Sequence, residues 1–202
     1  MTAPTRLVVA TGNAGKLREI RALLEPTGWQ ALGLAEAGID HAEVVETGRS
    51  YLENAVAKAV AAAHASGLPA LADDSGLEVD ALGGRPGVTS ARYGGPFLTD
   101  GERSARLLRD LQDVPHVRRQ ARFRAVVVLA LPQGERYVRE GLLEGRIAEA
   151  PRGENGFGYD PVFEIADGRT LAEMGDRKQQ ISHRSRALRA MMGVLGVLHD
   201  RA

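Results

Sequence analysis

Three separated segments of the chain carry residue types that could act on a phosphorylated ligand. Residues 11–16 offer backbone N–H groups and one ammonium. Asp73 and Asp74 form a carboxylate pair, and residues 156–163 place aromatic rings beside polar groups. A phosphate grip, a metal ligand and a base-stacking ring are what a metal-dependent enzyme needs to act on a nucleoside triphosphate.

The first segment has the order strand, turn, helix. Residues 7–10 form an apolar run that is typical of a strand covered on both faces. Apolar residues recur at helical spacing after Lys16, so the turn at Gly12 would point N–H groups and a helix start at an anion. The spacing fits neither a Walker A loop nor a dinucleotide-binding fingerprint. An alternative is that Gly12 and Asn13 only turn the chain and Lys16 is solvated.

The carboxylate pair follows a short strand that we predict over residues 68–72. Adjacent side chains of an extended chain point to opposite faces, so one aspartate would face a site while the other braces a loop. Two carboxylates would repel a polyphosphate unless a divalent cation lay between them, and Mg²⁺ suits this chemistry. The alternative is that Asp73 and Asp74 cap a turn at Ser75 and Gly76.

Two glutamates near the next predicted helix offer further carboxylates. Glu46 precedes this helix and is a candidate second metal ligand, although an exposed loop glutamate is the commoner explanation. Glu53 completes a capping box with Ser50, so its first role is expected to be structural. The helix would continue through an alanine-rich stretch and stop at Gly67.

The third segment presents Phe157 between two glycines, a setting that is unusual for a core side chain. A ring on such a loop can stack on a nucleobase, which contributes about 1–3 kcal/mol. Asp160 and Lys178 could read base edges or hold phosphate, as could His183 and Arg184. The last two would lie in the first helical turn, where cations oppose the helix dipole unless an anion or a hydrogen bond accounts for them. For His183 alone, an exposed helix start is the alternative.

Composition and element order predict one mixed α/β domain over residues 1–202. The 202 residues are 44% hydrophobic, and 26 Lys and Arg balance 26 Asp and Glu, which leaves no global field for nucleic acid or a membrane surface. The absence of cysteine excludes disulfides and thiol chemistry. Strand–helix alternation comes first, and long strands over residues 121–131 and 135–147 follow. No leader-like or membrane-length apolar segment stands out, so we expect a cytoplasmic protein.

Taken in order along the chain, these motifs resemble those of the inosine triphosphate pyrophosphatase family. The matching segments are residues 10–16, 53–55 with 58–59, 72–77 with 79–84, 86–88, 90–93, 156–163 and 181–184. The resemblance implies an elongated mixed α/β fold with the active site in a cleft between two lobes, and a homodimer. It also implies Mg²⁺-dependent hydrolysis of ITP, dITP and XTP to the monophosphate and pyrophosphate.

Carried over residue by residue, the resemblance implies roles for single side chains. Asp74 would be the general base and a metal ligand, and Glu46 the second metal ligand. The implied substrate-binding residues are Thr11, Gly12, Asn13, Ala14, Gly15, Lys16, Ser75, Phe157, Gly158, Tyr159, Asp160, Lys178, His183 and Arg184. Asp74 would activate a water that attacks the α-phosphorus, while Lys16 and the metal offset charge on the leaving pyrophosphate.

Base selectivity can be argued from hydrogen bonding. Hypoxanthine and xanthine present an acceptor at C6 where adenine presents a donor, so a donor such as Arg184 or a backbone N–H would reject ATP. Rejection of GTP needs a further clash, for which the sequence indicates no residue. Two rival classes are a pyrophosphatase of damaged pyrimidine nucleotides and a nucleotide sensor without turnover.

Overall fold

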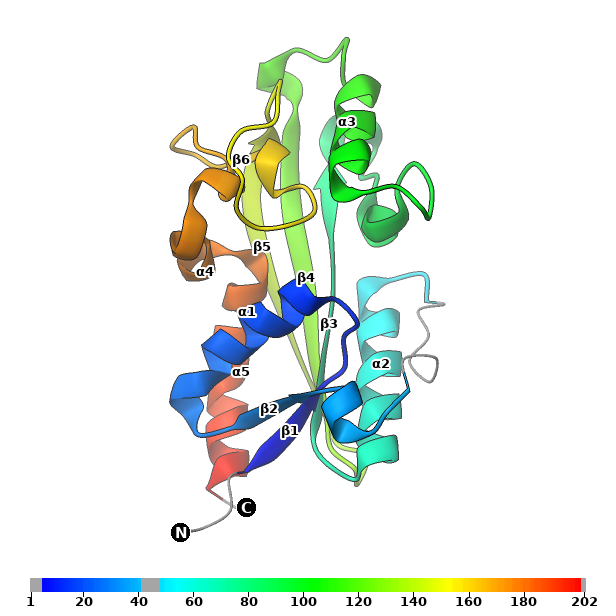
Figure 1. The fold of residues 1–202 in the computed structure, drawn as a ribbon, viewed down its shortest axis with the longest axis vertical. Helices are drawn as coiled ribbons and strands as arrows, with labels where there is room; N and C mark the ends of the chain where they lie inside the picture. The colour runs from blue at the N-terminus through cyan, green and yellow to red at the C-terminus, as the bar shows by residue number, and fades with distance from the viewer. Residues whose placement is uncertain (1–4, 41–47, 201–202) are drawn as a thin grey trace. The chain divides into compact units, whose positions relative to one another are not determined.

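The computed structural model describes residues 5–40 and 48–200. The helices and strands are β1 (Arg6–Val9), α1 (Ala14–Leu24), β2 (Gln30–Gly33), α2 (Tyr51–Ser66), β3 (Ala70–Val79), α3 (Asp100–Asp110), β4 (Gln120–Ala130), β5 (Arg136–Ile147), β6 (Phe163–Glu164), α4 (Lys178–Ile181) and α5 (His183–His199) (Figure 1). Among these residues, no helix is both long enough and apolar enough to cross a membrane.

The strands form one six-stranded mixed sheet in the order β2-β1-β3-β4-β5-β6. Strand β1 pairs in parallel with both β2 and β3, whereas β5 and β6 are antiparallel. The two long strands predicted over residues 121–131 and 135–147 are β4 and β5, and they form a hairpin whose turn is closed by a hydrogen bond from the Leu131 N–H to the Glu135 carbonyl at 2.9 Å. The predicted mixed α/β class is confirmed.

Contacts within the chain divide it into two compact units. Unit 1 comprises residues 1–74, 125–141 and 184–202, and unit 2 comprises residues 75–124 and 142–183. Strands β3, β4 and β5 each contribute residues to both units. The elongated shape and the cleft between lobes that the resemblance implies stay predictions.

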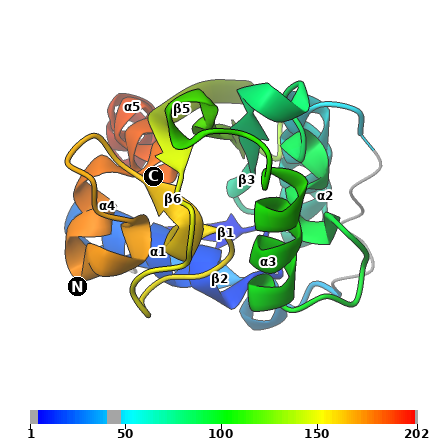
Figure 2. The same ribbon diagram turned by 90° about the horizontal axis from the view of Figure 1, so that it is seen from above.

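Unit 1 is a sandwich of helices around its strands. Helices α1 and α5 lie on one side of β1 and α2 lies on the other (Figures 1 and 2). The apolar cluster under α1 and α5 includes Leu7, Val9, Ile20, Leu24, Leu71, Leu188 and Met191. On the opposite side, α2 buries alanines such as Ala55 and Ala59, whose small side chains let the helix lie close to the sheet.

Unit 2 packs its apolar residues against one face of its strands only. The buried cluster includes Leu77, Val79, Leu107, Leu111, Phe123, Ile147 and Phe163. The residues that alternate with these along the strands include charged ones. Arg122 forms ion pairs there with three carboxylates, at 3.7 Å from Glu78, 2.9 Å from Asp80 and 3.3 Å from Glu144. A sheet with one packed and one charged face is typical of antiparallel strands.

The predicted helix ends are mostly confirmed. Ser50 caps α2 by accepting a hydrogen bond from the Glu53 N–H at 3.2 Å. The Glu53 carboxylate bonds to the Arg49 N–H at 2.7 Å, one residue before the position that a capping box requires. Gly67 ends the helix with a left-handed φ of 67°.

The predicted end of the third strand was wrong. Strand β3 does not stop at Ala72 but continues to Val79, so both aspartates lie inside it. Ser75 and Gly76 are also strand residues, which excludes the turn that Asp73 and Asp74 could have capped. Tertiary partners outweigh the poor strand propensity of aspartate here.

Candidate active site

Asp73 is fully buried and is the centre of an ion-pair network in unit 1. One of its carboxylate oxygens lies 2.7 Å from the Lys16 ammonium, and the other accepts a hydrogen bond from Arg184 Nε at 3.1 Å. Arg184 also donates to Glu19 in α1. The network therefore ties β3 to the first turns of α1 and α5.

Burial and charge act in opposite directions on these groups. Burial alone would raise the pKa of Asp73, but Arg184 and Lys16 outweigh it and hold that pKa far below its ordinary value. Burial lowers the pKa of Lys16, with Arg184 and Lys58 adding to the effect despite the attraction of Asp73. Asp73 is therefore ionised, and a further anion beside Lys16 would favour the charged form of the ammonium.

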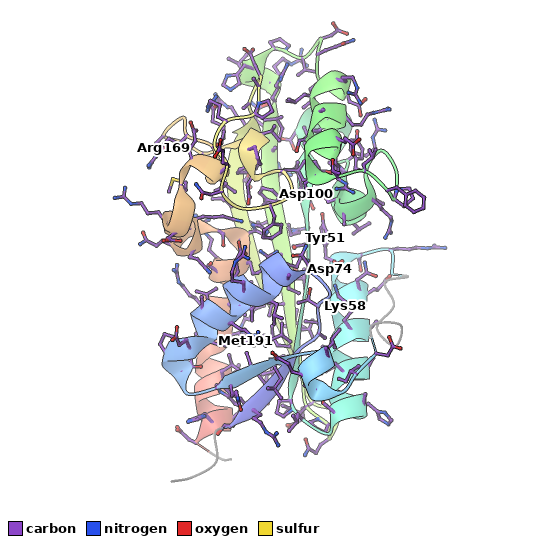
Figure 3. All side chains as sticks on the ribbon, in the orientation of Figure 1. Tyr51, Lys58, Asp74, Asp100, Arg169 and Met191 are labelled. Carbon is purple, nitrogen blue, oxygen red and sulfur yellow. The ribbon has the colours of Figure 1, made fainter. Side chains whose placement is uncertain are left out.

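Asp74 points to the other face of β3, as the alternation of an extended strand requires. It accepts a hydrogen bond from Asn54 Nδ2 at 2.9 Å and lies 3.5 Å from the Lys58 ammonium. Lys58 also donates to the Asp73 carbonyl at 2.8 Å. Figure 3 shows Lys58 and Asp74 between α2 and β3. The two carboxylates thus have separate sets of partners.

The sequence interpretation gave no separate role to Asn54 and Lys58. Both side chains are buried on the inner face of α2, among alanines. Their spacing of four residues in an otherwise apolar stripe was the available signal, because a buried lysine requires a partner. That partner is the carboxylate of Asp74 together with the adjacent main chain.

The turn before α1 has the geometry that the sequence predicts. Asn13 caps the helix by accepting from the Lys16 N–H at 3.0 Å, and its own N–H donates to Thr11 Oγ1 at 3.2 Å. Ala14 and Gly15 are the first helical residues, so their N–H groups have no partner within the helix. The alternative of a solvated Lys16 is wrong, since its side chain is 15% exposed and paired.

In unit 2, Asp160 connects Phe157 with Lys178. The buried Asp160 carboxylate accepts from the Phe157 N–H at 2.8 Å and from the Lys178 ammonium at 2.7 Å. The same ammonium lies 4.5 Å from the centre of the Phe157 ring, a cation–π contact. Asp160 therefore fixes the ring and the cation relative to each other.

Hydrogen bonds from Gly158 and Tyr159 hold the loop that carries Phe157 against two neighbouring segments. The Gly158 N–H donates to Asp100 at the start of α3 at 2.7 Å. Tyr159 is buried and donates to the Ser90 carbonyl at 2.9 Å, and burial raises the pKa of its hydroxyl. A ring on this loop is held in place before any ligand arrives.

The first residues of α5 are accounted for by specific contacts. His183 is 4% exposed and stacks on Phe123, with ring centres 4.7 Å apart and planes 9° from parallel. The alternative of an exposed helix start is therefore wrong. The positive charge of Arg184 is met by Asp73 and Glu19, which offsets its unfavourable place near the helix N-terminus.

The predicted site residues fall into two groups. The group in unit 1 contains residues 11–16, Asp74 and Arg184; the group in unit 2 contains Ser75, residues 157–160, Lys178 and His183. Ser75 is a half-buried residue of β3. Glu46 lies outside the described residues. The roles of all these residues toward a substrate stay predictions.

The surroundings of Asp74 suit a hard divalent cation that takes most of its ligands from elsewhere. Within residues 5–40 and 48–200, no three His, Cys, Asp or Glu side chains gather to hold a metal. Mg²⁺ is commonly held by one or two carboxylates together with phosphate oxygens and water. An ionised carboxylate has about four acceptor positions, so Asp74 can serve as one ligand while bonded to Asn54.

These features define a mixed α/β protein with a buried ionic centre at the start of its first helix. The Ham1 family model matches residues 7–194. A protein called "dITP/XTP pyrophosphatase" from Thermus thermophilus is 53% identical over 93% of this chain and 90% of its own length. One of the same name from Symbiobacterium thermophilum is 54% identical over 91% of each chain. The solved HAM1 protein from Coxiella burnetii has a TM-score of 0.85 and 40% identity, covering 95% of this chain and 98% of its own.

The chain therefore belongs to the Ham1 family. The resemblance inferred from the order of the motifs is confirmed.

Replacement of Asp73 by Asn should unfold unit 1 more easily. The change removes the carboxylate partner of the buried Lys16 and one of the two partners of Arg184, and breaking a buried ion pair typically costs about 3–5 kcal/mol. Because the pKa of Asp73 is lowered by folding, the advantage of the wild type is full above the ordinary value of 3.8 and shrinks as the pH falls below it. Urea unfolding at several pH values measures this difference, with exposed Asp113→Asn as the control. An advantage that grows on acidification would contradict the assignment.

Two neighbouring glycines provide a matched test of Asp160. A Cβ at Gly156 would lie 2.1 Å from Asp160 Oδ2, whereas a Cβ at Gly158 would meet nothing within 4 Å; both residues have positive φ. Gly156→Ala should therefore be less stable than Gly158→Ala by about 1.5–3 kcal/mol, because it displaces a carboxylate that accepts two hydrogen bonds. Chemical denaturation of both variants checks this. Equal stabilities would show that Asp160 does not hold the loop.

Proposed function

We propose that this chain hydrolyses the non-canonical purine nucleotides ITP, dITP and XTP to nucleoside monophosphate and pyrophosphate, which removes them from the nucleotide pool. The observation that carries the proposal is a pair of adjacent buried carboxylates on β3: Asp73 pairs with Lys16 at the start of α1, and Asp74 lies beside Lys58 of α2. It is supported by relatives called dITP/XTP pyrophosphatases that match this chain over nine-tenths of its length.

The phosphate chain is assigned to the start of α1. The first-turn N–H groups of Ala14 and Gly15 and the Lys16 ammonium together suit an oxyanion. Burial has lowered the pKa of Lys16, so a bound phosphate would strengthen its positive charge. Thr11, Gly12 and Asn13 complete this proposed phosphate loop.

Asp74 is assigned the proton that the reaction releases. Water oxygen bonds to the α-phosphorus, the bond from that phosphorus to the bridging oxygen breaks, and pyrophosphate leaves with the bridging oxygen. Asp74 accepts the water proton while Asn54 and Lys58 fix the position of its carboxylate. Asp74 and Glu46 would hold Mg²⁺, which would neutralise part of the phosphate charge.

The base is assigned to the Phe157 loop of unit 2. The Phe157 ring would stack on the purine, with Ser75, Gly158 and Tyr159 as further substrate contacts. Lys178 beside the ring offers a donor for an acceptor at C6, which adenine lacks. Arg184, the other donor considered for the base, is paired with Asp73 and Glu19. His183, which stacks on Phe123, remains a proposed substrate-binding residue.

Three further expectations belong to this proposal. They are that residues 1–202 act as one domain, that the enzyme is a homodimer, and that it works in the cytoplasm. They rest on composition and on the family resemblance.

Replacement of Asp74 by Asn tests the proposed proton acceptor. The rate of pyrophosphate release from ITP should fall at least about 100-fold in kcat, since a general base typically contributes 10²–10⁴. Asp113→Asn, an exposed change of the same charge, should keep the wild-type rate. Circular dichroism on both variants separates loss of catalysis from loss of fold, because Asp74 also pairs with Lys58. Turnover by a folded Asp74→Asn close to that of the wild type would refute the role.

A further inference from the structure

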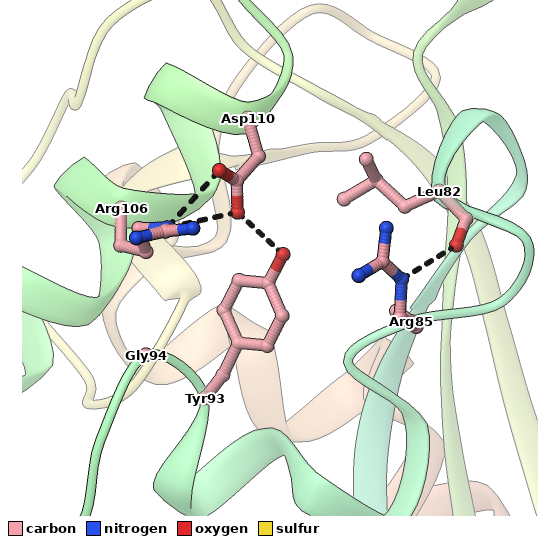
Figure 4. Close-up of a pocket in the computed structure, with 6 residues that line it drawn as sticks. All are labelled: Leu82, Arg85, Tyr93, Gly94, Arg106 and Asp110. Carbon is pink, nitrogen blue, oxygen red and sulfur yellow. Dashed lines mark hydrogen bonds and ion pairs between the residues drawn. The ribbon is translucent and has the colours of Figure 1, made fainter.

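A charged pocket lies in unit 2, lined by residues that the proposed reaction does not use. Its volume is about 310 Å³, and its walls are Leu82, Arg85, Tyr93, Gly94, Arg106 and Asp110 (Figure 4). This volume is at the lower end of the range for small-molecule sites. Two arginines and one aspartate give the walls a net positive charge.

One side of the pocket is an internally satisfied group. Arg106 Nε donates to both Asp110 oxygens at 3.0 and 3.1 Å, and the Tyr93 hydroxyl donates to Asp110 at 2.6 Å. Burial would raise the pKa of Asp110, but Tyr93 and Arg106 outweigh it and lower that pKa. Asp110 is thus ionised and neutralised by Arg106.

Arg85 stands on the other side, where its charge also helps to lower the pKa of Asp110 without a direct ion pair. Its Nε donates to the Leu82 carbonyl at 3.2 Å, which fixes the plane of the guanidinium. Among the described residues, its two terminal nitrogens have no hydrogen bond or ion pair. Figure 4 shows the Arg85 guanidinium facing Tyr93 and Asp110 across the pocket from Arg106.

The shape of the pocket is built into the backbone. Gly94 has a φ of 81°, and a Cβ there would lie 2.9 Å from Leu98 Cδ1 and 3.1 Å from Arg106 Cγ. Only glycine lets the chain pass this close to the Arg106 stem. Leu82 and the ring of Tyr93 add apolar walls beside the charged groups.

We propose that this pocket binds a small oxyanion, a phosphate or a carboxylate, between the guanidinium groups of Arg85 and Arg106. The terminal N–H groups of Arg85 form the planar fork that such anions accept in a bidentate manner. The Tyr93 hydroxyl, which donates to Asp110, can accept a hydrogen bond from a hydroxyl or a protonated oxygen of the ligand. None of its residues belongs to the proposed catalytic groups, and the proposal does not depend on the proposed function.

Titration of the isotope-labelled full-length protein, followed by NMR, tests the proposal. Inorganic phosphate and acetate are added separately at constant ionic strength, and pyrophosphate is avoided because it is the product of the proposed reaction. Saturable shifts are expected at the amides of Arg85 and Gly94. Arg85→Gln should weaken the binding at least about tenfold. Arg109→Gln removes an exposed charge from α3, the helix that carries Arg106, and should leave the affinity for the anion unchanged.

The arms of the titration separate the outcomes. Saturation by phosphate alone would narrow the ligand to phosphate compounds, and saturation by both anions would support the wider class. Arg85→Lys, which keeps the charge but loses the fork, should bind more weakly than the wild type and covers the case of an unfolded Arg85→Gln. Shifts without saturation, or the same affinity in Arg85→Gln and Arg109→Gln, would overturn the proposal. The outcome of this titration is independent of the kinetic test of Asp74→Asn, so the two proposals can fail separately.

Discussion

The burial of an ionised Asp73 is the constraint on which unit 1 depends. A carboxylate that is removed from water without partners costs several kcal/mol even after the protein relaxes. Lys16 and Arg184 offset this cost only if the first turns of α1 and α5 both reach β3. The position of three elements is therefore fixed by one side chain, and Glu19 secures Arg184 from the helix beside it.

The alternation of β3 gives the neighbouring carboxylate a different environment. Asp74 faces α2, where Asn54 holds one oxygen and Lys58 lies beside the other. Asp73 thus ties three elements together, whereas the adjacent Asp74 is the carboxylate that we propose for catalysis. Pre-organised partners of this kind cost no rearrangement at the moment of reaction.

Much of the fold could be predicted because it rests on local patterns. The apolar run of β1, the helical spacing after Lys16, the glycine after α2 and the hairpin of β4 and β5 are all signals carried by neighbouring residues. The continuation of β3 could not be predicted, because aspartates disfavour strands and their partners lie far away in sequence. Arg184 is 111 positions from Asp73.

The candidate site divides in the same manner. Phe157 between glycines was a local signal, and its half-buried ring lies beside Lys178. Its stacking on a base stays a prediction. The inward direction of Asp160 depends on Lys178, which follows 18 residues later, and no pattern near Asp160 indicates it. Asn54 and Lys58 interrupt an apolar stripe of α2, but the passage of β3 beside that helix is what gives them Asp74 as a partner.

The most direct measurement of the proposed function is the product pattern of ITP turnover, followed by phosphorus NMR with ATP as the matched substrate. We expect inosine monophosphate and pyrophosphate, with kcat/KM for ITP exceeding that for ATP by roughly 10⁴-fold. Release of orthophosphate with inosine diphosphate would show that water attacks the γ-phosphorus and not the α-phosphorus. Equal kcat/KM for the two nucleotides would contradict the assignment of the base to a donor beside Phe157.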